Sequence, residues 1–158
     1  MIALNKFSID FRVDADGAIG LGHLIRCLAL GEMLQREYQV VFHCRPLSLL
    51  LIKEIESRGF RYYEVIDDAE WVVGLNSSNC VVLDGYQFKY ELELSIKLTG
   101  ATLVTIDDLF SRSFAADLII NHSPKANSKL YSSLPFTLFA LGNDYVLLRS
   151  VFLHMARK

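Results

Sequence analysis

The sequence has few of the features that mark several other classes of protein. It contains only three cysteines (Cys27, Cys44 and Cys80), which are odd in number and far apart. No C-x-x-C or H-x-x-H spacing is present, so we expect no zinc site and no other metal. Each cysteine lies in an apolar segment, which favours buried thiols in a reducing compartment over disulfides.

An excess of basic residues and long apolar segments are also missing. The 16 Lys and Arg residues are outnumbered by 18 Asp and Glu, and the net charge of −2 argues against a nucleic-acid partner. No apolar stretch approaches the roughly 20 residues of a membrane-spanning helix, and the first residues lack the apolar core of a signal peptide. We therefore expect a cytoplasmic protein without a membrane span.

The composition is that of a globular domain with a packed core. Apolar residues make up 52% of the 158 residues and charged residues 22%. No repeat, low-complexity segment or linker divides the chain, so residues 1–158 are expected to form a single domain.

Segments with strand and helix patterns alternate along the chain. Strands are predicted at 7–13, 40–44, 60–65, 80–84, 101–106, 118–121 and 145–148. Helices are predicted at 23–36, 49–57, 68–75, 90–98 and 151–158, and 122–138 is expected to be a long loop. This alternation predicts an α/β fold, a Rossmann-like doubly wound parallel sheet.

Polar residues gather where the predicted strands end. They occur at 14–23, at 84–86, at Asp107 and Asp108, and at 121–122, each time after an apolar segment. In doubly wound sheets, ligands bind beyond the carboxyl ends of the strands. These four loops are therefore the predicted binding region.

The first of these loops leads into a helix that begins with His23. Gly17, Gly20 and Gly22 permit close backbone approach, and the helix N-terminus would favour an anion. The glycine spacing is neither the dinucleotide fingerprint nor a P-loop. A histidine at a helix start favours the neutral imidazole that a general base requires, although a capping or solvated histidine fits the position equally well.

Two arginines flank this loop. Arg26 lies on the same helical face as His23, where it would contact a phosphate, hold an acid such as Asp14, or remain on the surface. Arg12 alternates with apolar neighbours on its strand and needs a partner, for which Asp14 or Asp108 is available.

The later strand ends offer further candidates. Asp84 would orient a substrate or a catalytic histidine, or merely cap its loop, and Tyr86 follows it closely. Asp107 and Asp108 point in opposite directions on an extended chain, so one of them is expected to be a cap or a partner for Arg12. The remaining histidines are weaker candidates: His122 follows a strand end, and His43 and His154 are expected to be structural.

The stretch RVDADGAIGLGHLIRCLALGEML resembles the opening of the hydrolases that cleave UDP-2,4-diacetamido-2,4,6-trideoxy-β-L-altrose in pseudaminic-acid biosynthesis, and of related spore-coat polysaccharide proteins. Further similar segments follow in the same order: VVLDGYQF, TIDDL, DLIINHSP and ALGNDYVLLRSVF. The residues that match the opening motif of the family are Arg12, Asp14, Ile19, Gly20, Gly22, His23, Arg26, Leu28 and Leu30.

The resemblance implies the N-terminal half of a GT-B fold and a catalytic role for His23. That residue would position or deprotonate the water that attacks the anomeric carbon, which releases UDP and the free sugar with inversion. Tyr86 would line the sugar pocket, and no metal or cofactor is implied. The predicted substrate-binding residues are Arg12, Asp14, Gly20, Gly22, Arg26, Asp84, Tyr86, Asp108 and Asn121.

Two departures from the family shape this prediction. Family members are about twice as long, so the C-terminal nucleotide-binding half is expected to be absent and the chain to be poorly active alone. Val151 stands where the family often has an acid. The expected partners are a nucleotide-sugar and a C-terminal half or separate chain; the alternatives are a glycosyltransferase half-domain and a non-catalytic half.

Overall fold

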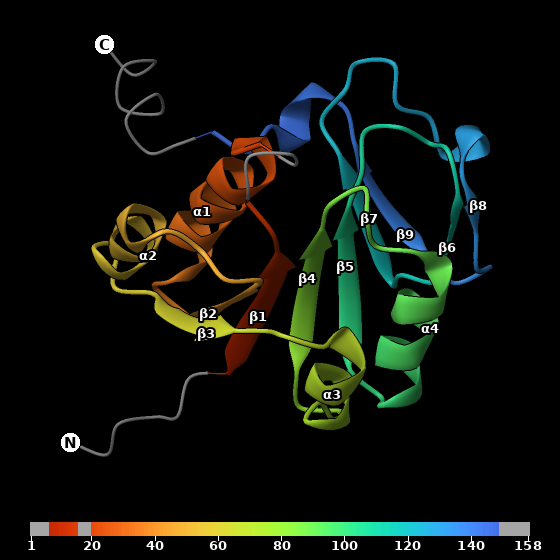
Figure 1. Cartoon of the computed structure of the whole chain (residues 1–158). Coiled ribbons are helices and arrows are strands. Elements are labelled where there is room, and N and C mark those ends of the chain that lie inside the picture. The colour runs from red at the N-terminus through yellow and green to blue at the C-terminus, as the bar shows by residue number, and fades with distance from the viewer. Residues whose placement is uncertain (1–6, 16–19, 149–158) are drawn as a thin grey trace, which may run out of the picture.

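The computed structural model describes residues 7–15 and 20–148, and its centre is a seven-stranded parallel sheet (Figure 1). The strand order is β3-β2-β1-β4-β5-β7-β9. The predicted Rossmann-like α/β fold is thereby confirmed. The sheet strands are β1 (Ser8–Val13), β2 (Gln39–Cys44), β3 (Arg61–Glu64), β4 (Cys80–Asp84), β5 (Thr102–Ile106), β7 (Leu118–Asn121) and β9 (Leu138–Leu141).

Four helices cover the two faces of this sheet. They are α1 (Gly22–Leu34), α2 (Leu49–Glu56), α3 (Asp68–Val73) and α4 (Tyr90–Leu98). Neighbouring strand residues contribute to different cores: Val82 packs with residues of α1 and α2, whereas Val81 and Leu83 pack with residues of α3 and α4. The sheet is therefore doubly wound, because successive side chains of a strand point to opposite faces. None of the described helices is long and apolar enough to cross a membrane.

The strand order changes direction between β1 and β4. The chain moves outward from β1 to β3, returns to place β4 on the other side of β1, and then continues to β5, β7 and β9. The carboxyl ends of β1 and β4 therefore flank a topological switch point, which is where such sheets bind ligands. Register pairing sets Val13 of β1 beside Asp84 of β4, and Asp84 beside Ile106 of β5.

The local sequence pattern predicts the helices and strands from β1 to β5 correctly, and each predicted end lies within two residues of the end in the structure. The bounds of β4, α4 and β7 agree with the predicted segments 80–84, 90–98 and 118–121. The predicted helix 23–36 begins one residue earlier, at Gly22, and ends at Leu34. Strong periodicity and flanking turn residues explain this agreement.

The C-terminal part differs from the prediction. The last described strand is β9, not 145–148, and its first residue lies within the predicted loop 122–138. That loop also holds η1 (Ser128–Leu130) and β8 (Ser132–Ser133), which pairs with β6 (Ser113–Phe114), while η2 (Asn143–Tyr145) enters the predicted strand. Strand β9 is an edge strand that is only partly buried, so its sequence pattern is weak. Gly17, Ile19 and the predicted helix 151–158 lie outside the described residues.

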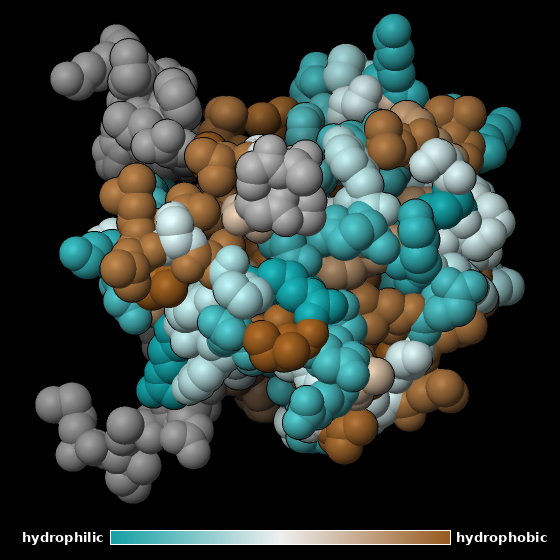
Figure 2. Space-filling view, in the orientation of Figure 1, coloured by the Kyte–Doolittle hydropathy of each residue, from teal (hydrophilic) through white to brown (hydrophobic). Residues whose placement is uncertain are grey.

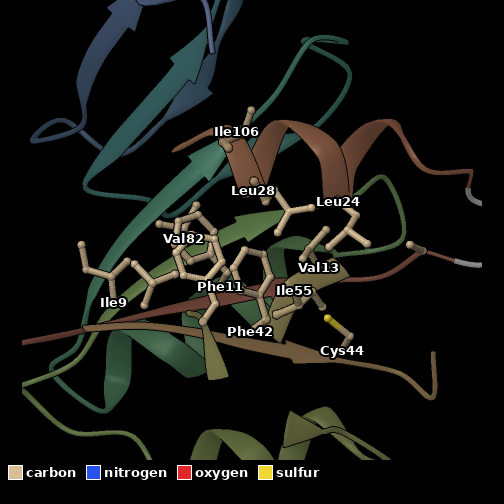
Figure 3. Packing of buried hydrophobic residues seen from close by; sticks show 14 of the residues in the cluster. Ile9, Phe11, Val13, Leu24, Leu28, Phe42, Cys44, Ile55, Val82 and Ile106 are labelled. Atoms are coloured by element: carbon tan, nitrogen blue, oxygen red, sulfur yellow. The ribbon is translucent and has the colours of Figure 1, made fainter. Parts of the chain in front are cut away.

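The core beneath α1 and α2 is centred on aromatic rings. Phe42 of β2 is fully buried, and its ring centroid lies 4.9 Å from that of Phe11 and 5.5 Å from that of Phe60. Figure 3 shows Phe11 and Phe42 surrounded by Val82, Leu28 and Ile55, which come from three different elements. This cluster joins β1 and β2 to the helix that carries His23.

We expect Phe42→Ala to lower the free energy of unfolding by about 3–5 kcal/mol, because it leaves a cavity between stacked rings. The same change at Phe136, which is 56% exposed, serves as the control and is expected to cost less than about 0.5 kcal/mol. Urea unfolding followed by circular dichroism measures both. Equal losses in the two variants would contradict the described core.

Candidate active site

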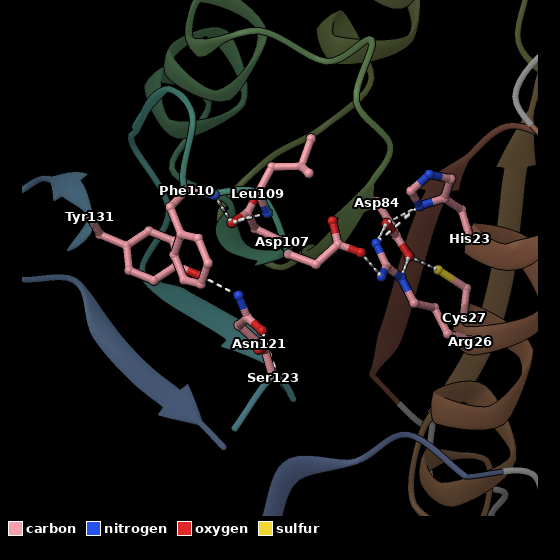
Figure 4. A network of polar contacts seen from close by, with 11 residues as sticks. His23, Arg26, Cys27, Asp84, Asp107, Leu109, Phe110, Asn121, Ser123 and Tyr131 are labelled. Carbon is pink, nitrogen blue, oxygen red and sulfur yellow. Dashed lines mark hydrogen bonds and ion pairs between the residues drawn. The ribbon is translucent and has the colours of Figure 1, made fainter. Parts of the chain in front are cut away.

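The carboxylate of Asp84 is the centre of the candidate site. It is the last residue of β4, at the switch point, and it is fully buried. Helix α1 begins opposite this strand end, so His23, Arg26 and Cys27 all reach the carboxylate from its first two turns (Figure 4). A buried carboxylate needs such partners, because an ion removed from water is otherwise strongly destabilised.

His23 and Asp84 form a hydrogen-bonded pair. His23 Nδ1 lies 2.7 Å from Asp84 Oδ1, and the imidazole is almost completely buried. Asp84 also pairs with the guanidinium of Arg26, and a carboxylate in such a pair accepts hydrogen bonds. When Nδ1 carries the hydrogen of a neutral ring, it donates to this carboxylate and leaves a lone pair on Nε2. The ring of Tyr86 meets the imidazole edge-on at a centroid distance of 4.6 Å.

Arg26 bridges two acids on neighbouring strand ends. Its Nε donates to Asp84 Oδ2 at 2.6 Å, its Nη2 donates to Asp84 Oδ1, and its Nη1 donates to Asp108 Oδ2 at 2.9 Å. Burial opposes the charge of Arg26, but the hydrogen bonds to Asp84 and Asp108 raise its pKa further. Arg26 thus holds acids, one of the alternatives offered for it, but the acid named there, Asp14, was wrong because it pairs with Arg12.

The two adjacent aspartates have separate roles, as their alternation along the chain predicts. Asp107 accepts from the backbone amides of Leu109 and Phe110 and so caps the turn after β5. Asp108 faces Arg26, and its Oδ1 is buried with no hydrogen-bond partner among the residues that the structure describes. Burial and the nearby Asp108 raise the pKa of Tyr86, so its hydroxyl stays protonated near neutral pH.

A second charged cluster lies around Arg12. This side chain is fully buried; it pairs with Asp14, as expected, and its Nε donates to Asp68 of α3 at 2.7 Å. The alternative partner Asp108 was wrong. Asp14 also accepts from the backbone amide of Arg45 at 2.7 Å and from the side chain of Gln87 at 3.0 Å.

Sequence reasoning missed Asp68 and Gln87 as members of this cluster. Asp68 is an acid in the first turn of α3, where its charge suits the helix dipole. It lies 56 residues from Arg12, and only the crossover from β3 to β4 brings it there. Nothing in the local pattern predicts that contact.

The remaining predicted residues occupy different surroundings. Gly20 has a φ of 80°, a conformation that favours glycine, and Gly22 is the first residue of α1. Leu21, at the N-cap position, supplies no side-chain hydrogen bond to the first helical amides. Asn121 is fully buried, and its amide is engaged by Tyr131 and by the backbone of Ser123. Asn121 therefore stabilises the β7 end internally.

An apolar groove between α1 and α2 is separate from this site. Figure 2 shows hydrophobic side chains gathered over these two helices. The groove encloses about 240 Å³ and is lined by Ile25 and Leu28 of α1, which lie on the helix face opposite His23 and Arg26, and by Leu21 at the N-cap. Its lining therefore does not include His23, Arg26 or Asp84.

This arrangement suits proton transfer. Asp84 fixes the ring of His23, Arg26 compensates the buried charge, and Tyr86 and Asp108 lie beside the imidazole. The described residues include no group of three or more His, Cys, Asp or Glu side chains placed to hold a metal ion. A histidine whose Nδ1 donates to a buried carboxylate is an oriented general base.

Comparison with known proteins supports the resemblance inferred from the sequence. No family model matches the chain. A curated protein of Campylobacter jejuni, named UDP-2,4-diacetamido-2,4,6-trideoxy-beta-L-altropyranose hydrolase, is 30% identical over 156 residues. The match covers 94% of this chain but 54% of the relative, so the chain spans about half the length of the curated protein it matches.

We expect Asp84→Asn to destabilise the chain by about 3 kcal/mol, because it leaves the buried charge of Arg26 without its main counterion. The control is Glu54→Gln, which removes a half-exposed partner of Arg58 and is expected to cost less than about 0.5 kcal/mol. Urea unfolding at neutral pH compares them. A loss at Asp84 as small as that at Glu54 would show that the carboxylate is not buried as described.

Acid should weaken the cluster around Arg12. Burial opposes ionisation of Asp14, but hydrogen bonds from Arg12 and from the backbone of Arg45 hold its pKa below the usual value. A carboxyl with a lowered folded-state pKa stabilises the fold above its unfolded pKa, and this contribution is lost as the pH falls through the folded pKa.

We therefore expect the free energy of unfolding to fall between about pH 5 and pH 3, and to fall less in Asp14→Asn. The variant should also be less stable at pH 7, since Arg12 loses a partner. Urea unfolding of the unchanged chain and of Asp14→Asn at pH 7, pH 5 and pH 3 provides the measurement. An unchanged acid dependence in the variant would exclude Asp14 as a source of it.

Proposed function

We propose that this relative of the Campylobacter hydrolase hydrolyses a UDP-linked diacetamido-trideoxy sugar, with His23 as the general base. The single observation that carries the proposal is the buried pair of His23 Nδ1 and Asp84 Oδ1, 2.7 Å apart at the switch point of the sheet. Nε2 of the imidazole is then the basic atom. The name of the relative supplies the substrate class.

The proposed reaction is a single displacement by water. Nε2 of His23 takes a proton from water as the water oxygen bonds to the anomeric carbon. The bond from that carbon to the UDP oxygen breaks, and UDP leaves with the bonding electrons, so the configuration inverts. Asp84 stabilises the imidazolium that forms, because its carboxylate accepts from Nδ1.

The neighbouring groups are suited to hold the sugar. Tyr86 is half exposed against the imidazole, and its hydroxyl is a donor near neutral pH. The Asp108 side chain is 30% exposed and its carboxylate interacts with the hydroxyl of Tyr86, so a hydroxyl or amide N–H of the sugar would meet these two residues together. Gly20 and Gly22 precede and begin α1, whose N-terminal backbone amides would donate hydrogen bonds to the oxygens of the diphosphate.

We further propose that a second domain or chain completes the uridine-diphosphate site, as in GT-B proteins. Support comes from the length of the Campylobacter relative, of which this chain matches 54%. Substrate held by one half alone would be bound weakly. We therefore expect slow hydrolysis by the 158-residue chain.

The test is release of UDP from UDP-2,4-diacetamido-2,4,6-trideoxy-β-L-altrose by stoichiometric amounts of the chain, followed by 31P NMR in 18O-labelled water. We expect slow release, 18O in the free sugar, and a rate lower by about 10²- to 10⁴-fold in His23→Gln. The control variant is His43→Gln, because His43 also pairs with an aspartate, Asp10, but lies on β2. Its rate should equal that of the unchanged chain.

Three outcomes would contradict the proposal. Equal rates with and without His23 exclude it as the base, and UDP release that requires an acceptor sugar indicates a glycosyltransferase. Fast multiple turnover by the chain alone excludes the need for a second half. If release is too slow to follow, titration with the UDP-sugar must shift the imidazole signals of His23, and an absent shift at millimolar substrate would exclude binding at this site.

A further inference from the structure

We infer that Arg26 is a positioning residue that selects the tautomer of His23, and that Asp108 holds Arg26 in the orientation needed for this. The inference rests on the proposed function, in which His23 Nε2 is the base. It replaces the predicted role of Arg26 in substrate binding with a role in positioning His23. The observation behind it is the position of His23 Nδ1, which lies between a carboxylate and a guanidinium.

Those two neighbours require opposite states of the same nitrogen. Nδ1 is 2.7 Å from Asp84 Oδ1 and 3.0 Å from Arg26 Nη2. A carboxylate oxygen bonds Nδ1 only if Nδ1 carries a hydrogen, whereas the guanidinium bonds it only if Nδ1 presents a lone pair. The neutral ring therefore has two hydrogen-bonded arrangements in this site.

Only one of the two arrangements makes a base. With the hydrogen on Nδ1, the lone pair of Nε2 is available to water. With the hydrogen on Nε2, the ring is bonded to Arg26 through Nδ1, and Nε2 can donate but cannot accept. The choice of tautomer thus decides whether His23 can perform the proposed step.

The contacts of Arg26 favour the basic arrangement. Its Nε and Nη2 donate to both oxygens of Asp84, which orients Oδ1 toward the imidazole. Its Nη1 is held by Asp108 at 2.9 Å, so the planar fork is fixed between the ends of β4 and β5. A lysine ammonium lacks this fork and cannot span two carboxylates in the same way.

This geometry also argues against a contact between Arg26 and a phosphate. All three of its nitrogens already donate to Asp84 or Asp108, and the side chain is 13% exposed. A phosphate would have to displace an aspartate. The buried Asp84 and the partly exposed Asp108 are the partners that the fold supplies.

The test reads the tautomer directly, in the full 158-residue chain and without substrate. Two-bond 1H–15N correlation spectra of chain labelled with 15N-histidine distinguish the two tautomers, and His23→Gln assigns the signals. We expect the Nδ1–H form of His23 in the unchanged chain. In Arg26→Lys, the ratio of Nδ1–H to Nε2–H should fall by about tenfold, the effect of losing a charged hydrogen bond.

A second variant covers the case in which Arg26→Lys fails to fold. Asp108→Asn keeps the shape of the side chain but removes the charge that holds Nη1, and it should shift the ratio in the same direction by a smaller factor. Asp68→Asn is the matched control. Asp68 pairs with Arg12 and Arg45 in the other cluster, so its loss should leave the His23 ratio unchanged.

The outcomes separate this inference from the proposed function. An Nδ1–H tautomer that is unchanged in Asp108→Asn and in folded Arg26→Lys overturns the role of Arg26 but leaves His23 as the base. A predominant Nε2–H tautomer in the unchanged chain contradicts both. If Arg26→Lys loses UDP-sugar binding while the tautomer of His23 stays the same, Arg26 is a substrate-binding residue. That result also overturns the inference.

Discussion

The buried charge of Asp84 is the constraint on which the candidate site depends. A carboxylate that is fully removed from water at a strand end must be compensated, and α1 supplies Arg26, His23 and Cys27 for this within two turns. Because Arg26 also reaches Asp108, the same compensation joins the ends of β4 and β5 to the start of α1. The geometry of the candidate site and the stability of the fold thus depend on the same buried carboxylate.

The predicted binding residues fall into two charged clusters, one around Arg12 and one around Arg26, which have different surroundings. Arg12 and Asp14 are buried, and their polar atoms are engaged with each other and with α3 and the loop after β2, so they support the fold beneath the first loop. The cluster around Arg26 instead includes two accessible side chains, the half-exposed Tyr86 and Asp108, which is 30% exposed. A substrate would meet this second set.

The comparison with the Campylobacter hydrolase and the geometry of the candidate site support the same proposal in different ways. The relative is matched over 94% of this chain, and its name supplies a class of reaction. The geometry contributes an oriented imidazole of the kind that such a reaction needs. The match spans 54% of the relative, so the comparison covers about half of that protein.

The sequence by itself determined the order and type of the strongly periodic elements and the gathering of polar residues at their carboxyl ends. Local periodicity suffices for this, and it fails at the edge strand β9, where burial is weak. Only the tertiary structure decided the partners. His23 meets Asp84 across 61 residues, and Arg26 meets Asp108 across 82, because the crossovers and the strand register align these ends. Such distances are set by packing, which no local pattern encodes.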